Sequence, residues 1–213
     1  MCVERSERLV YSALMQASGF VTAGGRSSRM GTDKAWLELA GQTMIERVIA
    51  ALVPVASPVA IIANDPRYAR LGLQVFSDTN AGVGPLEAIR TALANSSTER
   101  VVLVGCDLPF VTSRLFSFLL DLEGRHQAVV PLSRHGLLEP LCAVYSREAL
   151  APVTDLIASG ERKVSCLFDK VPTRFVAFAE ISHLIGAEAF FENVNTPAEF
   201  ERATRLLDHS GDA

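Results

Sequence analysis

Short apolar runs alternate with amphipathic segments along this chain, which is the pattern of successive βαβ units. Each run is rich in β-branched residues and is bounded by turn-forming residues, as buried strands usually are. The pattern predicts a three-layer α/β sandwich, in which helices cover both faces of a mainly parallel central sheet. The predicted strands span Gly19–Ala23, Pro58–Ala63, Leu73–Phe76, Arg100–Gly105, Gln127–Pro131 and Leu141–Tyr145.

Helix-capping residues recur between these strands. Thr43 and Glu46 match a capping box, in which each side chain bonds the backbone N–H of the other residue. Pro85 suits the first turn of a helix, because a backbone N–H would be unpaired there in any case. Further helices are predicted after Thr112, over Ala149–Ala158 and after Thr196.

Composition favours one folded domain. The chain has 213 residues, of which 49% are hydrophobic and 21% are charged, so its usage is that of a globular protein. No repeat or linker-like segment divides it. Residues 19–213 are therefore expected to form a single domain, preceded by an N-terminal extension of unknown order, residues 1–18.

Charge and cysteine usage exclude several classes of protein. A net charge of −4 argues against nucleic acid or an anionic membrane as a partner, since both attract a concentrated basic surface. The four cysteines lie far apart without a C-x-x-C pair, so buried free thiols are favoured over a zinc site or disulfides. Without a secretory signal or a long apolar segment, a cytoplasmic protein is expected.

The segment AGGRSSRMGTDK is the strongest candidate for chemistry. It directly follows the first predicted strand and runs from Ala23 to Lys34. Glycines let backbone N–H groups approach a phosphate closely, and Arg29 and Lys34 would neutralise its charge. The spacing is neither that of a Walker A loop nor that of a dinucleotide fold. A solvated turn is the alternative, but turns seldom gather so many phosphate-binding groups, so we expect a nucleoside triphosphate site.

Two further segments place polar groups where predicted strands end. In VVLVGCDLPF, Asp107 follows a buried strand, and ligands of open α/β sheets bind at that edge. A carboxylate beside triphosphate oxygens is a natural magnesium ligand, whereas the alternative role of helix cap already belongs to Thr112. In FSDTNAGVGPLEAI, Asp78 and a glycine-rich turn are expected to close over a base or ribose. Asn64, after the second strand, is a weaker candidate.

Taken in this order, the segments resemble the molybdenum cofactor guanylyltransferases, a nucleotidyltransferase family with a Rossmann-like α/β fold. The resemblance covers nearly the whole chain and includes MIERVIAAL, EPLCAVY and ENVNTPAEF. It implies transfer of GMP from GTP to molybdopterin, with Mg²⁺ as cofactor and pyrophosphate as the second product. Molybdoenzyme maturation proteins are further candidate partners.

The resemblance also implies roles for particular residues. Lys34 would contact the phosphates, and Asp107 would bind the metal. Arg29, whose charge would stabilise the departing pyrophosphate, is expected to be catalytic together with Lys34 and Asp107. Asn193 and Asn195 would lie on the pterin side. The residues expected to bind GTP are Thr22, Ala23, Gly24, Gly25, Lys34, Asn64, Asp78, Gly84, Pro85, Leu86 and Asp107.

Two positions depart from the family pattern. Thr22 stands where leucine is usual, and its β-branched side chain still suits the end of a strand. Glu87 stands where small residues are common after Gly-Pro-Leu. Its carboxylate could accept hydrogen bonds from guanine, but we expect it to face solvent, as most helical glutamates do.

Three rival functions remain. A molybdenum cofactor cytidylyltransferase shares the fold, but such relatives tend to have Ala-Ala-Gly in the first loop and to lack Gly-Pro-Leu. A nucleotidyltransferase acting on a sugar phosphate or polyol phosphate would not be expected to carry EPLCAVY and ENVNTP in this arrangement. A non-catalytic nucleotide-binding adaptor would be expected to lose Asp107 or Lys34, and both are present.

Overall fold

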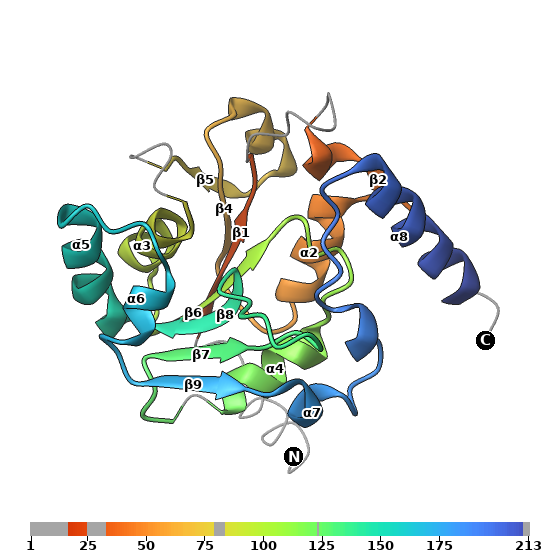
Figure 1. Cartoon of the computed structure of the whole chain (residues 1–213). Helices are drawn as coiled ribbons and strands as arrows, with labels where there is room; N and C mark the ends of the chain where they lie inside the picture. The colour runs from red at the N-terminus through yellow and green to blue at the C-terminus, as the bar shows by residue number, and fades with distance from the viewer. Residues whose placement is uncertain (1–16, 25–32, 79–83, 123, 211–213) are drawn as a thin grey trace, which may run out of the picture.

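A seven-stranded sheet forms the middle layer of the computed structural model, which describes residues 17–24, 33–78, 84–122 and 124–210 (Figure 1). The order across the sheet is β5-β4-β1-β6-β8-β7-β9. β8 runs antiparallel to β6 and β7, and the other neighbouring strands are parallel. The strands are β1 (Ala17–Thr22), β4 (Val59–Ile62), β5 (Gln74–Phe76), β6 (Arg100–Gly105), β7 (Ala128–Pro131), β8 (Cys142–Ser146) and β9 (Thr173–Val176).

All six strands predicted from the sequence are present; β6 has the predicted bounds, and the ends of the other five are shifted. β1 begins at Ala17, two positions earlier than expected. Ala17 and Ser18 therefore belong to the sheet and not to the N-terminal extension. β9 and the short hairpin of β2 (Glu38–Leu39) and β3 (Gln42–Thr43) were not predicted. The mainly parallel α/β sandwich is confirmed.

Helices cover both faces of the sheet, as Figure 1 shows. On one face α2 (Met44–Leu52), α4 (Ser113–Asp121) and α7 (Phe178–Ile181) enclose one apolar cluster. On the other, α3 (Pro85–Asn95), α5 (Leu150–Ala158) and α6 (Ser165–Phe168) enclose a second. Successive strand residues point to opposite faces, so Val102 and Val104 join the first cluster while Val101 and Leu103 join the second. Each face of the sheet therefore has its own core.

The remaining helices lie around these layers. α8 (Pro197–Ser210) packs against the β2–β3 hairpin at the side of the molecule (Figure 1). No helix among the described residues is long and apolar enough to cross a membrane. The short 3₁₀ helices are η1 (Lys34–Trp36), η2 (Pro66–Leu71), η3 (Arg147–Ala149) and η4 (Ala187–Ala189).

The predicted caps determine where the helices begin. The N–H of Thr43 donates to Glu46 at 2.9 Å, as a capping box requires, and α2 follows. Thr112 accepts a hydrogen bond from the N–H of Leu115 at the start of α4. α3 begins at Pro85. Its predicted apolar stripe, Leu86, Ile89 and Leu93, is fully buried.

The carboxyl ends of β1 and β6 lie side by side. After β1 the chain continues to β4 on one side, whereas β6 pairs with the other side of β1. The N–H of Cys106, just past β6, donates to the carbonyl of Thr22 at 2.9 Å. Such a point, where the strand order reverses, opens a crevice in which open α/β sheets bind ligands. The phosphate-loop candidate and Asp107 both leave the sheet at this point.

Candidate functional site

Three polar side chains from distant parts of the chain meet at this edge. The ammonium Nζ of Lys34 lies 3.0 Å from Oδ2 of Asp107 and 2.5 Å from Oδ1 of Asn195. The Lys34 and Asp107 side chains are 14% and 26% exposed, so the pair is sheltered but open to a ligand. Lys34 belongs to η1, Asp107 follows β6, and Asn195 precedes α8. We call these three residues the cation cluster.

Asp107 is held at the site by its neighbours. Its carboxylate folds back over Gly105, where an added Cβ would lie only 2.4 Å from Oδ1 of Asp107. A side chain at this position would displace the carboxylate, so glycine leaves room for the conformation that Asp107 adopts. The backbone carbonyl of Asp107 accepts a hydrogen bond from the N–H of Val194 at 3.0 Å. That bond joins the end of β6 to the segment that carries Asn195.

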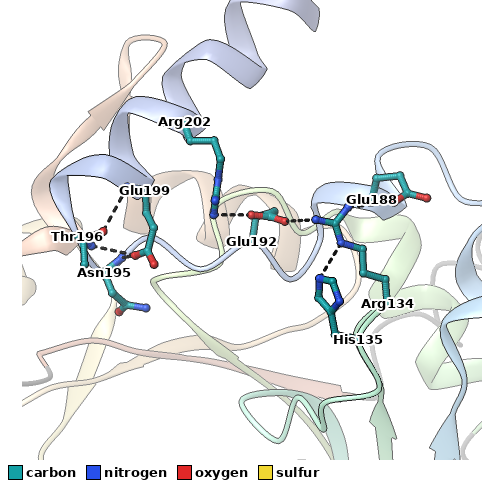
Figure 2. Close-up of polar contacts among 8 residues, drawn as sticks. All are labelled: Arg134, His135, Glu188, Glu192, Asn195, Thr196, Glu199 and Arg202. Atoms are coloured by element: carbon teal, nitrogen blue, oxygen red, sulfur yellow. Dashed lines mark hydrogen bonds and ion pairs between the residues drawn. The ribbon is translucent and has the colours of Figure 1, made fainter.

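Asn195 is positioned by the cap of α8, shown in Figure 2. Oε2 of Glu199 accepts hydrogen bonds from the N–H groups of Asn195 and Thr196 at 2.7 and 3.0 Å. The hydroxyl of Thr196 accepts from the N–H of Glu199 in return. The predicted cap is therefore confirmed, and it fixes the backbone from which the Asn195 amide reaches Lys34.

Ion pairs on the surface continue from this segment (Figure 2). Glu192 pairs with Arg202 of α8 at 2.8 Å and with Arg134 of the loop between β7 and β8 at 3.1 Å. Arg134 also donates to the ring of His135 and lies 3.7 Å from Glu188. Both arginines are about half exposed, so these pairs contribute little to stability and mainly connect the surface segments.

Asp78, which follows β5, and Gly84, which precedes α3, stand at the same edge of the sheet. The Thr91 hydroxyl donates to Oδ1 of Asp78 at 3.1 Å. Burial, reinforced by the nearby charge of Glu87, raises the pKa of Asp78, while the Thr91 bond opposes the shift. Gly84, at φ 80° and ψ −149°, adopts a conformation that favours glycine, and α3 begins at the next residue.

The expectation that Glu87 faces solvent is wrong. Its side chain is 1% exposed and binds the guanidinium of Arg90 through both carboxylate oxygens, at 2.6 and 2.9 Å. Glu87 stands buried in the first turn of α3, and Arg90 compensates its charge about one turn later. The i,i+3 spacing makes this pairing possible within one helix.

The other predicted residues are distributed along the edge. Ala23 continues from β1 and donates its N–H to the carbonyl of Ile62 at 2.9 Å, while Gly24 is exposed at φ +86°. Asn64 is exposed just beyond β4. The Asn193 side chain makes no hydrogen bond within the described residues, so it does not join the cation cluster. Gly25 and Arg29 lie outside the described residues.

Sequence reasoning missed Glu139. This residue precedes β8, which pairs with β6, so it stands at the same edge as Asp107. Burial, and secondarily the charge of Asp107, raises the pKa of Glu139 to about 7. The segment EPLCAVY was part of the resemblance, but only the pairing of β8 with β6 shows that its glutamate lies near the site.

The neighbouring cysteine does not add a nucleophile. Cys106 is fully buried, and burial together with the adjacent Asp107 raises the pKa of its thiol to about 12. A thiol with that pKa stays protonated near neutral pH and is unreactive. Among the described residues, no three His, Cys, Asp or Glu side chains are grouped so that they could hold a metal ion. The cluster's chemistry is that of one ammonium, one carboxylate and one amide.

Comparisons with known proteins identify the family of the chain. The family model of the MobA-like NTP transferase domain matches residues 19–174. A probable molybdenum cofactor guanylyltransferase of Pelotomaculum thermopropionicum is 35% identical over 199 residues, which are 92% of this chain and 96% of that protein.

Solved structures share the fold at lower identity. Molybdopterin-guanine dinucleotide biosynthesis protein A from Archaeoglobus fulgidus has a TM-score of 0.77 at 23% identity, covering 90% of this chain and 99% of that one. The 4-diphosphocytidyl-2C-methyl-D-erythritol synthase from Anaerococcus prevotii has a TM-score of 0.70 at 12% identity, covering 94% and 99%. Proteins whose names differ in the base thus share one fold, so the fold alone does not identify the nucleotide.

The fold and the matched family together define a nucleotidyltransferase. The chain belongs to the MobA-like NTP transferase family, because the family model spans most of its length and the Pelotomaculum relative covers nearly all of it. The resemblance to the molybdenum cofactor guanylyltransferases is thereby confirmed.

Proposed function

We propose that this protein transfers GMP from GTP to molybdopterin, forming the guanine dinucleotide form of the molybdenum cofactor and pyrophosphate. The observation that carries the proposal is the cation cluster, in which Asp107 and Asn195 converge on Lys34 at the switch point of the sheet. Oxygen ligands beside a mobile ammonium suit a metal ion and a polyphosphate together. The named substrates are supported by the relatives, whose names are those of probable molybdenum cofactor guanylyltransferases.

Magnesium is the proposed cofactor, and the residues present fit it. Asp107 and Asn195 each direct one oxygen at the same positive charge, the Lys34 ammonium. Mg²⁺ is commonly held by one or two protein oxygens, with phosphate oxygens and water in the remaining positions. Asp107 and Asn195 would hold the ion, and Lys34 would turn to the phosphates. When bound, the ion would neutralise charge on the triphosphate and orient it.

The proposed reaction is a displacement at the α-phosphorus of GTP. An oxygen of the molybdopterin phosphate forms the new bond. The bond from the α-phosphorus to the oxygen that bridges to the β-phosphate breaks, and pyrophosphate leaves with its electron pair. Lys34 donates hydrogen bonds that stabilise charge on the departing group. A phosphate monoester is largely ionised near neutral pH, so the attack needs no strong general base.

Guanine selectivity is proposed to reside around Asp78. The Thr91 hydroxyl orients its carboxylate by donating to Oδ1, which keeps a second lone pair, so the two carboxylate oxygens together can accept two adjacent N–H groups of a base. Guanine presents adjacent N1–H and N2–H donors, whereas cytosine has no such adjacent pair. A cytidylyltransferase of the same family is the alternative that this assignment must exclude.

Thermal unfolding with each nucleotide and Mg²⁺ tests the choice of base. A ligand at about 100 times its dissociation constant adds roughly 2.7 kcal/mol of apparent stability. We expect GTP to raise the midpoint and CTP to leave it unchanged. Equal shifts with GTP and CTP would remove the claim of guanine selectivity.

Pyrophosphate release from GTP, measured with and without molybdopterin, tests the reaction. Release should require the pterin, Mg²⁺ and an intact Asp107. Asp107→Ala should abolish release while the protein stays folded, whereas Asp155→Ala, on the exposed side of α5, should be fully active. If the wild-type protein releases no pyrophosphate with molybdopterin present, it binds nucleotides without transferring them.

A further inference from the structure

The segment after β4 is bonded to the turn that carries Lys34. Asp33 caps η1, and its Oδ1 accepts a hydrogen bond from the N–H of Ala35 at 3.2 Å. Its other oxygen, Oδ2, accepts from the hydroxyl of Tyr68 at 2.8 Å. Tyr68 belongs to η2 and is fully buried. The carboxylate directly before Lys34 is thus held from both sides.

Ring contacts reinforce this connection. The rings of Tyr68 and Trp36 are stacked, with centroids 5.1 Å apart and planes inclined by 23°. The guanidinium of Arg70 lies 3.8 Å from the centroid of Trp36, within the range of a cation–π contact. Arg67 adds an ion pair with Asp33 at 3.6 Å, although its side chain is 57% exposed. η2 therefore contacts η1 through a hydrogen bond, a stack and charges.

The Tyr68 hydroxyl is the specific part of this arrangement. Phenylalanine would fill the same apolar space, whereas a buried phenol must find an acceptor. The acceptor in this protein is the carboxylate of Asp33, next to Lys34 in the chain. Because the Lys34 carbonyl also accepts from the N–H of Leu37, its backbone is fixed while its flexible stem remains able to rotate.

We infer that Tyr68, acting through Asp33, is a positioning residue for Lys34, an inference that rests on the proposed function. With the backbone fixed, the ammonium moves from Asp107 and Asn195 to the phosphates of GTP by side-chain rotation alone. η2 also begins two residues after Asn64, a predicted nucleotide contact just beyond β4. The same unit therefore sets the distance between Asn64 and Lys34.

A double-mutant cycle tests the inference, because positioning through Lys34 must vanish when the ammonium is gone. Tyr68→Phe removes only the hydroxyl. In the wild-type background it should lower kcat for pyrophosphate release about tenfold, since small misplacements of a catalytic group are costly. In a Lys34→Ala background the same change should have no further effect. An equal loss in both backgrounds, or no loss in either, would overturn the inference.

Ser96→Ala is the matched control. The Ser96 hydroxyl is also buried and bonded, to Ser18 and to the carbonyl of Thr98, but it lies at the opposite edge of the sheet. Ser96→Ala should reduce stability without changing kcat. If Ser96→Ala and Tyr68→Phe both lowered kcat, the cause would be loss of folded protein and not misplacement of Lys34.

The cycle is also measured on GTP binding in Mg²⁺, by thermal shift. This readout separates two failures. If the wild-type protein binds GTP without releasing pyrophosphate, the proposed function fails. The inference about Tyr68 would still be supported if Tyr68→Phe lowered the affinity for GTP only when Lys34 is present. Equal losses of affinity with and without Lys34 overturn it whatever the activity.

Discussion

Glu87 carries a buried negative charge that Arg90 neutralises within α3. Replacing it by glutamine keeps the shape but substitutes a neutral amide for the carboxylate that binds the guanidinium. Arg90 is 23% exposed, so water recovers part of its solvation. We expect Glu87→Gln to lower the free energy of unfolding by about 1–3 kcal/mol, as for hydrogen bonds to charged groups, measured by urea denaturation at neutral pH. Glu201→Gln, an exposed change on α8, should differ from wild type by less than about 0.5 kcal/mol, and equal losses would contradict the assignment.

Glu139 should make stability depend on pH in the ligand-free protein. Its pKa is raised from a reference of 4.5 to about 7 in the folded state. Between these values the folded state retains a proton that the unfolded chain has lost, so stability falls as the pH rises. Glutamine does not titrate. Urea midpoints should therefore show Glu139→Gln gaining on wild type from about pH 4.5 to about pH 7 and then levelling off; a difference independent of pH would refute the shift.

Residue types alone pointed to part of the site. Lys34, Asp107 and Asn195 stand in segments whose composition or family resemblance suggested phosphate, metal and pterin chemistry. Their mutual contact was not predictable, because it depends on the pairing of β1 with β6 and on the Val194–Asp107 bond. Tyr68 carries no motif, and its relation to Lys34 exists only because η2 folds back onto η1.

At the scale of elements, the residues that begin α8 contribute both to the stability of the fold and to the position of Asn195 in the site. Glu199 binds two backbone N–H groups beside Asn195, so Glu199→Ala should cost about 1 kcal/mol of stability, as loss of a cap does. It should also lower kcat, since the Asn195 amide loses its fixed backbone. Glu201→Ala, on an exposed position of the same helix, should change neither thermal midpoint nor turnover. A full kcat in Glu199→Ala would show that the cap serves folding alone.

The elements that sequence reasoning found and missed differ in burial. β6, whose predicted bounds were correct, is buried along nearly its whole length and so has a continuous apolar pattern. β9 includes Arg174 and the exposed Phe175, and its pattern is too mixed to read as a strand. β2 and β3 have two residues each, which is too short for any periodicity.

At the scale of the whole molecule, the cation cluster exists only when three distant segments are folded together. The first loop, the end of β6 and the segment before α8 meet across a sheet whose two faces have separate cores. If the described part of the chain unfolds as one cooperative unit, a stability change made at one edge of the sheet must shift the unfolding midpoint measured at either edge. That expectation follows from two-state behaviour.

Trp36 is the sole tryptophan of the chain and lies in η1 with Lys34, so its fluorescence can follow unfolding at the site. This signal reports unfolding at the edge of the sheet that carries the cation cluster, whereas far-ultraviolet circular dichroism reports the unfolding of all helices and strands. We expect both signals to give the same urea midpoint. Ser96→Ala, at the opposite edge, should lower the two midpoints equally, and GTP with Mg²⁺ should raise them equally, because one transition links both edges. If the fluorescence midpoint lay at a lower urea concentration than the circular dichroism midpoint, or did not change in Ser96→Ala, the edge that carries the cation cluster would unfold as a separate unit.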